Sequence, residues 1–143
     1  MKKTLPKILA SVLILFLTAC AGTGTKDISS ISFKKSPDKA NLFFIRKNVY
    51  LASAGLIKVL VNGVEVGKIG VGEMEKFQTA PGSTSIKAST GNLAALGATG
   101  DTYAFKAEAG KNYYFILTYD QKFFSGGWKI NETTERGFKS AVE

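Results

Sequence analysis

Short runs in which apolar and polar residues alternate fill most of the chain after residue 40. In one of them, Thr84, Ile86 and Ala88 alternate with Ser85, Lys87 and Ser89. This period of two is typical of a β-strand with one buried face. Turn residues separate eight such segments: 41–46, 56–61, 64–69, 76–80, 83–89, 101–107, 112–119 and 128–133. The pattern predicts an all-β fold, a single antiparallel β-sandwich of about seven or eight short strands.

The clearest local signal is the pair Asn62-Gly63 between two β-branched runs. A type I′ turn needs a positive φ at both central residues, which glycine adopts freely and asparagine better than most. We therefore predict a hairpin in which Val61 pairs with Val64, Leu60 with Glu65 and Val59 with Val66. In that register Ile57, Val59, Val61, Val64 and Val66 share one buried face.

Two further segments depart from simple alternation. Residues 41–46 are apolar on both faces, which favours a strand inside the sandwich over an exposed edge. Near the end of the chain, Phe138, Ala141 and Val142 lie at helical spacing and predict a short C-terminal helix within 135–142.

The first twenty residues have a different pattern. A basic start, Met1-Lys2-Lys3, precedes an apolar run that ends in Leu17-Thr18-Ala19-Cys20. This ending resembles the lipobox of bacterial lipoproteins. The resemblance implies cleavage between Ala19 and Cys20, with 1–19 as the signal peptide, and attachment of acyl chains such as palmitate to Cys20. The alternative is a transmembrane anchor, but the apolar run is shorter than the ~20 residues that a spanning helix needs.

Residues 20–39 are expected to be the lipidated cysteine and a flexible tether, with the sandwich domain over 40–143. The tether is rich in Gly, Ser, Thr and Lys, which favours disorder, although Ile28, Ile31 and Phe33 are candidates for docking on the domain. The residue after the cysteine is Ala21. An aspartate at that position would resemble a signal that retains lipoproteins in the inner membrane. The expected location is therefore the cell envelope, with the periplasmic leaflet of the outer membrane favoured over the inner membrane.

Composition narrows the chemistry. The formal charge of +8 falls to +5 when the three leader lysines, Lys2, Lys3 and Lys7, are removed. The basic residues are scattered rather than grouped, which argues against nucleic acid as a partner. The chain has one cysteine and no histidine, so it lacks an intrachain disulfide and the commonest general base and metal ligand. We expect no catalytic, cofactor or metal site, and hence no enzyme.

Two weaker patterns have simpler explanations. Glu73 and Glu75 would share one side of an extended segment, as paired catalytic carboxylates do, but charged residues between turns usually form a solvated edge. The run Gly67–Gly72 superficially suggests a phosphate loop, but its spacing does not fit and no helical pattern follows, so turn glycines are favoured.

The sequence 123–128, Phe-Phe-Ser-Gly-Gly-Trp, is the main candidate contact patch. Phe123, Phe124 and Trp128 around a flexible loop are suited to binding a protein or a glycan. The alternative, which we favour, is that Phe123 and Trp128 close the open end of the sandwich, because large aromatic side chains are mostly buried.

The order of motifs from Ala40 to Thr134 resembles a family of bacterial lipoproteins known only as a domain of unknown function. The motifs are 40–46, the hairpin 59–67, Phe77 with Pro81-Gly82, Thr102-Tyr103 and 109–115. The hairpin and Pro-Gly are distantly similar to PEGA-type surface β-domains. Neither resemblance implies a catalytic motif.

Two functions remain open. The first is a membrane-anchored, non-catalytic binding or structural module, with an envelope protein or a cell-wall polymer as partner. The alternative is a carrier of a small ligand or lipid, with a cavity at the sandwich end beside Thr90–Gly100. A filled core with an exposed aromatic patch would favour the module, and a large apolar cavity would favour the carrier.

Overall fold

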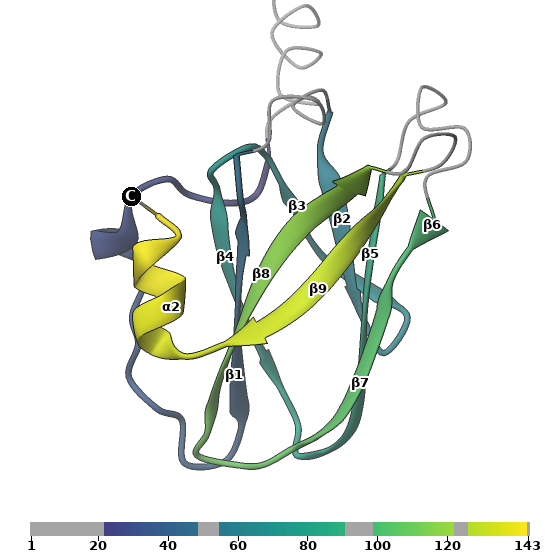
Figure 1. Cartoon of the computed structure of the whole chain (residues 1–143). Helices are drawn as coiled ribbons and strands as arrows, with labels where there is room; N and C mark the ends of the chain where they lie inside the picture. The colour runs from purple at the N-terminus through teal and green to yellow at the C-terminus, as the bar shows by residue number, and fades with distance from the viewer. Residues whose placement is uncertain (1–21, 49–54, 91–98, 122–125, 143) are drawn as a thin grey trace, which may run out of the picture.

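The computed structural model describes residues 22–48, 55–90, 99–121 and 126–142. Within them two β-sheets pack face to face, which confirms the all-β sandwich (Figure 1). The strands are β1 (Ala40–Arg46), β2 (Ile57–Val61), β3 (Val64–Ile69), β4 (Met74–Thr79), β5 (Gly82–Thr90), β6 (Thr99–Gly100), β7 (Thr102–Ala107), β8 (Asn112–Gln121) and β9 (Gly126–Thr133). All except the two-residue β6 correspond to a predicted segment.

The larger sheet has the order β4-β1-β8-β9-β6, and the smaller one has the order β3-β2-β5-β7. The sheets are not purely antiparallel as predicted, because β1 pairs with β8 in parallel, and β6 with β9. Parallel neighbours need a crossover, and here the six strands β2 to β7 lie between β1 and β8 along the chain. Alternation along the sequence defines the faces of a strand but carries no information on the direction of its neighbour.

The β2–β3 hairpin forms with the predicted turn, since φ is 50° at Asn62 and 80° at Gly63. The predicted register is correct for the first two pairs and wrong beyond them, because a β-bulge makes Val59 pair with Gly67 instead of Val66. The shift places Ile69 opposite Ile57, and both side chains are fully buried, whereas the regular register would place Lys68 there. Val64, expected on the buried face, lies at the hairpin tip and is 65% exposed.

The core between the two sheets is aromatic and aliphatic. The largest side chains in it come from β1, β8 and β9, and Phe44 stacks on Phe115 with 5.4 Å between ring centroids. Every residue of β1 is buried, as its apolar sequence predicts for a strand covered on both faces.

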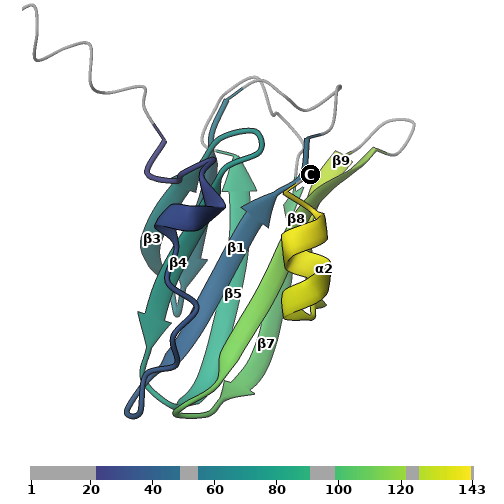
Figure 2. The ribbon, with the colours of Figure 1, turned by 90° about the vertical axis from the view of Figure 1, so that its left-hand side faces the viewer.

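A second apolar layer covers the outer face of the larger sheet (Figure 2). Phe43 is its centre: its ring centroid is 5.0 Å from that of Phe33 and 5.0 Å from that of Tyr114, and those two centroids are 6.3 Å apart. The cover consists of the N-terminal segment, which includes the short 3-10 helix η1 (Ile28–Ser30), and the helix α2 (Glu135–Ser140).

Residues 22–39 were expected to be a flexible tether, and the structure differs. They run along the outer face of the larger sheet, and Ile28, Ile31 and Phe33 pack on the second apolar layer. The polar composition favoured disorder, but three apolar residues at suitable spacing bury enough surface against Phe43 to order the segment.

The predicted C-terminal helix is confirmed and ends at Ser140 rather than Val142. The Thr134 side chain caps its first turn by accepting a hydrogen bond from Gly137 N. Phe138 is the helical residue that is fully buried, and it packs edge-on against Phe43.

Candidate functional site

The structure tests only part of the predicted site. Ala19 and Cys20, the residues of signal cleavage and lipidation, lie outside the described residues, and so do Phe123 and Phe124. Trp128, the third member of the proposed contact patch, is 2% exposed and belongs to the core. Its burial agrees with the favoured alternative, in which Trp128 belongs to the fold and not to a surface patch: β9 begins at Gly126 and its alternation directs Trp128 between the sheets.

Trp128 lies beside a buried arginine. The guanidinium carbon of Arg46 is 4.9 Å from the centre of the Trp128 ring, and its Nη1 donates hydrogen bonds to the carbonyls of Gly55 at 2.7 Å and Ile69 at 3.2 Å. Burial lowers the pKa of Arg46, and the nearby Glu73 carboxylate opposes that shift. Arg46 thus links the ends of β1, β3 and β9.

The residues next to the expected lipidation site form what we call the N-terminal clasp, residues 22–25. Thr23 N donates to Lys68 O at 2.8 Å, and Lys68 N donates to the Thr23 hydroxyl at 2.8 Å. Thr25 and Met74 exchange backbone hydrogen bonds of 2.8 and 2.7 Å. Because Lys68 is in β3 and Met74 is in β4, the clasp joins the adjacent edges of the two sheets.

The two glycines of the clasp permit this close approach. A Cβ atom on Gly24 would lie 2.9 Å from Met74 O and 2.9 Å from Glu73 Cβ, and one on Gly22 would lie 2.9 Å from Lys68 O. The composition of residues 20–39 predicted that these glycines belong to a flexible linker. Glycine is typical both of flexible linkers and of places where two backbone segments approach closely, so only the contacts in the structure distinguish the two roles.

Glu73 and Glu75, the candidate carboxylate pair, lie under the clasp. Glu73 Oε2 accepts a hydrogen bond from Gly70 N at 2.7 Å, so this amide is unavailable to a phosphate. Within the run Gly67–Gly72, the residues up to Ile69 belong to β3, and only Gly70, Val71 and Gly72 lie in the turn before β4. Burial raises the pKa of Glu75, a hydrogen bond from Thr23 opposes the shift, and the charge of Glu73 adds to it. Glu73 thus has a hydrogen-bond partner in the fold, whereas Oε2 of Glu75 is buried without one among the described residues.

The raised pKa of Glu75 makes a testable prediction. A carboxyl whose pKa is higher in the folded state than in the unfolded state destabilises the fold above that pKa, and the penalty disappears on acidification below about 4.3, its ordinary value. Glu75→Gln should therefore unfold at a higher urea concentration than the native protein at pH 7, and the difference should vanish near pH 4. Glu108→Gln, which changes a surface partner of Lys111, is the matched control. An equal gain at both pH values would contradict the assignment.

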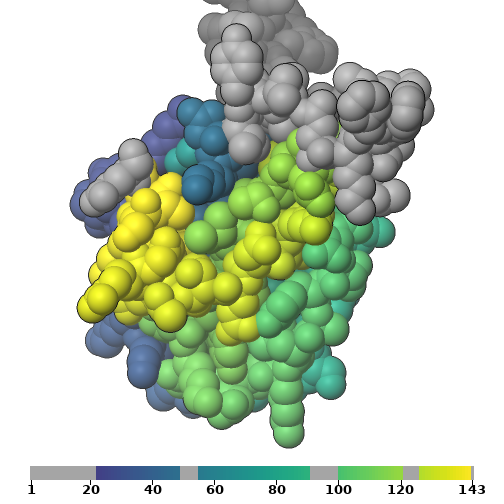
Figure 3. Space-filling view, in the orientation of Figure 1, coloured from purple at the N-terminus to yellow at the C-terminus, as the bar shows by residue number. Residues whose placement is uncertain are grey.

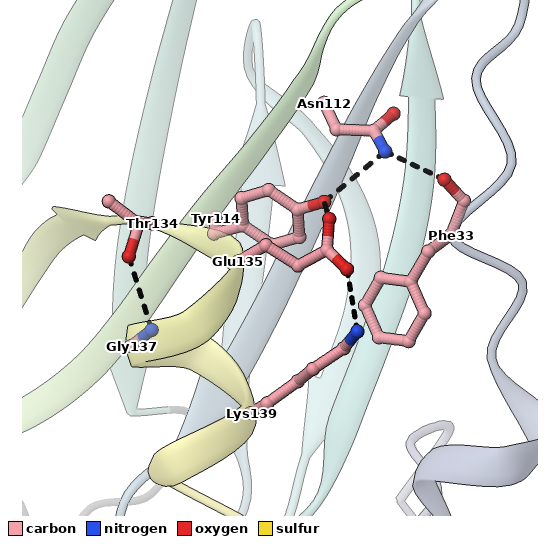
Figure 4. Close-up of polar contacts among 7 residues, drawn as sticks. All are labelled: Phe33, Asn112, Tyr114, Thr134, Glu135, Gly137 and Lys139. Carbon is pink, nitrogen blue, oxygen red and sulfur yellow. Dashed lines mark hydrogen bonds and ion pairs between the residues drawn. The ribbon is translucent and has the colours of Figure 1, made fainter.

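The most connected polar network lies between the N-terminal segment, β8 and α2 (Figure 4). Asn112 Nδ2 donates to Phe33 O at 2.8 Å and to the Tyr114 hydroxyl at 3.2 Å, and that hydroxyl donates to Glu135 Oε2 at 3.0 Å. Lys139 Nζ donates to Glu135 Oε1 at 2.6 Å. These two donors, Lys139 first, hold the pKa of Glu135 below its ordinary value.

An open groove of about 420 Å³ lies next to this network, where α2 and the N-terminal segment are side by side on the surface (Figure 3). It is lined by Ile28, Ser29, Ile31, Phe33, Lys139 and Val142. The groove lies on the outer layer and not between the sheets. The cavity expected for a carrier would lie beside Thr90–Gly100, where residues 91–98 are outside the described residues.

The described residues hold no group of three or more His, Cys, Asp or Glu side chains suited to a metal ion. In the same part of the chain, no helix is both long and apolar enough to cross a membrane. Comparison with known proteins adds no relative, since neither a protein-family model nor a curated protein matches the chain.

Proposed function

We propose that this chain is a lipoprotein of the bacterial cell envelope, anchored through acyl chains on Cys20, with the β-sandwich as a non-catalytic binding or structural module. The observation that carries the proposal is the ending Leu17-Thr18-Ala19-Cys20 behind a basic start and a short apolar run. Three acyl chains would hold the protein far more firmly than a single chain, which binds a membrane only marginally.

The contacts of the described residues support a non-catalytic role. The titratable side chains with shifted pKa values, such as Glu75, Glu135 and Tyr114, lie in contacts that join layers of the fold. The chain has no histidine to act as a general base, and lipidation would consume its one cysteine. The proposed partner is an envelope protein or a cell-wall polymer, in line with the resemblance to lipoproteins of unknown function.

Ala21 supports the outer membrane as the site of the anchor. In envelopes with two membranes, an aspartate directly after the lipidated cysteine resembles a signal that retains a lipoprotein in the inner membrane. This chain has alanine at that position. The proposed location is the periplasmic leaflet of that membrane.

Cys20→Ala should abolish the anchor. We expect the variant to incorporate no radiolabelled palmitate and to accumulate as uncleaved precursor or as soluble protein, because the thiol is the acyl acceptor in the proposed reaction. The measurement combines labelling of growing cells with separation of membranes from soluble protein.

The control is Thr18→Ser, which keeps small side chains before the cysteine and should leave both labelling and fractionation unchanged. Palmitate incorporated into Cys20→Ala at the native level would refute the proposal.

A further inference from the structure

The clasp has a consequence for how the sandwich meets the membrane, and the inference rests on the proposed function. Thr23 N is hydrogen-bonded to Lys68 O, three residues after Cys20. An extended chain spans at most about 3.6 Å per residue, so the Cα atoms of Cys20 and Thr23 are at most about 11 Å apart. A lipid-anchored Cys20 therefore allows little separation between bilayer and domain.

The contacts fix the direction of the chain over residues 22–25. The clasp is held on two sides, by Lys68 of β3 and by the reciprocal pair of Thr25 and Met74 in β4. Gly22 and Gly24 fit so closely that a side chain at either would overlap backbone of the sandwich. The clasp is thus packed on the sheet edges and is not a flexible linker.

The clasp lies at one end of the sandwich. Lys68 is next to the last residue of β3 and Met74 is the first of β4, at the end where β1 finishes with Arg46. The turn at Ala109-Gly110 lies at the opposite end, as both ribbon views show (Figures 1 and 2). The strand β1, Ala40–Arg46, runs from one end toward the other.

Charge at the clasp end is compatible with a lipid surface. Lys26 follows the clasp and Lys47 follows β1, and both are exposed. Neither forms an ion pair with an acidic residue of the described ranges, whereas Lys58, Lys68, Lys111, Lys129 and Lys139 do. Cationic side chains near a bilayer are attracted to anionic headgroups.

We propose that the clasp holds the sandwich upright on the bilayer, with the strand end that carries Arg46 and Lys47 facing the lipid headgroups and the Ala109-Gly110 turn pointing away. The interaction surface is the part of this end that carries the clasp, Lys26 and Lys47, and the partner is the membrane that carries the anchor. The part of the domain free for other partners is then the far end and the sides.

Two introduced thiols measure the orientation, because lipidation consumes the chain's one cysteine. Asn48→Cys, which keeps the neighbouring Lys47, and Ala109→Cys are labelled with a donor dye in the mature lipoprotein, in vesicles of phosphatidylethanolamine and phosphatidylglycerol with an acceptor dye on the headgroups. Six strand residues of about 3.3 Å each separate Asn41, beside the far turn, from Lys47. We expect the label at position 109 to be farther from the bilayer by on the order of 20 Å.

A ten-residue Gly-Ser insertion between Ala21 and Gly22 is the control, because it leaves the clasp on the domain but frees the domain from the anchor. The two labels should then report similar distances. Equal distances in the native protein, or an insertion that leaves the contrast unchanged, would overturn the orientation while the lipid anchor stands. Protein that carries no lipid on Cys20 would overturn the proposed function and this inference with it.

Discussion

Trp128→Ala should lower the free energy of unfolding by about 3–5 kcal/mol, much of the stability of a small domain. The side chain is 2% exposed, packs at 65° to Tyr119 with 5.2 Å between ring centroids, and lies under the Arg46 guanidinium. Its loss leaves a cavity and also exposes a buried cation to a less favourable environment. Urea denaturation at neutral pH measures the change.

Trp128→Phe is the matched control, because it keeps an aromatic ring in the core. The Trp128 Nε1 atom has no hydrogen-bond partner among the described residues, so the phenylalanine loses ring volume but no such bond. We expect it to be clearly more stable than the alanine variant. An alanine variant within about 0.5 kcal/mol of the native protein would mean that Trp128 behaves as a surface residue, contrary to the structure.

Phe43→Ala is expected to have a comparable effect, about 3–5 kcal/mol, through the outer layer. Phe43 is fully buried and its ring contacts those of Phe33 and Tyr114, while Phe138 packs edge-on against it. Its removal takes away the surface on which the N-terminal segment rests. Besides the loss in urea denaturation, we expect faster trypsin cleavage after the exposed Lys34 and Lys35.

Phe33→Ala distinguishes the loss of global stability from the release of the N-terminal segment. It removes the contact from the segment's side and leaves Phe43 in the sheet, so cleavage after Lys34 should accelerate with a smaller loss of global stability. If Phe43→Ala left the cleavage rate at the native level, the N-terminal segment would be held without the aromatic stack.

The sequence predicted the strands well because burial on one face produces a period of two, which segments such as 83–89 show directly. The turn at Asn62-Gly63 was equally predictable from the sequence, since few residues adopt a positive φ. The bulge opposite Val59 was missed because it depends on which residue, Lys68 or Ile69, meets Ile57 across the strands. That choice is made by burial in the assembled sandwich.

The largest difference between prediction and structure concerns the N-terminal segment, which was predicted to be a flexible tether and is packed on the sandwich. Gly22 and Gly24 have the composition of a linker, yet here they fit against the carbonyls of Lys68 and Met74. Asn41, the second residue of the apolar strand β1, is fully buried, and its Nδ2 donates to Lys34 O at 3.0 Å. A polar residue in such a strand needs a hydrogen-bond partner, and together with the apolar Ile28, Ile31 and Phe33 it indicates that a further segment covers the strand.

The parallel pairing of β1 with β8 also bears on the order of folding. Asn41 and Asn112, side by side in the sheet, are 71 residues apart in the chain. Non-local pairing of this kind slows folding, because the chain must close a long loop before the contact forms. The most apolar strand of the domain therefore stays without its central neighbour β8 until the intervening strands β2 to β7 have been synthesised.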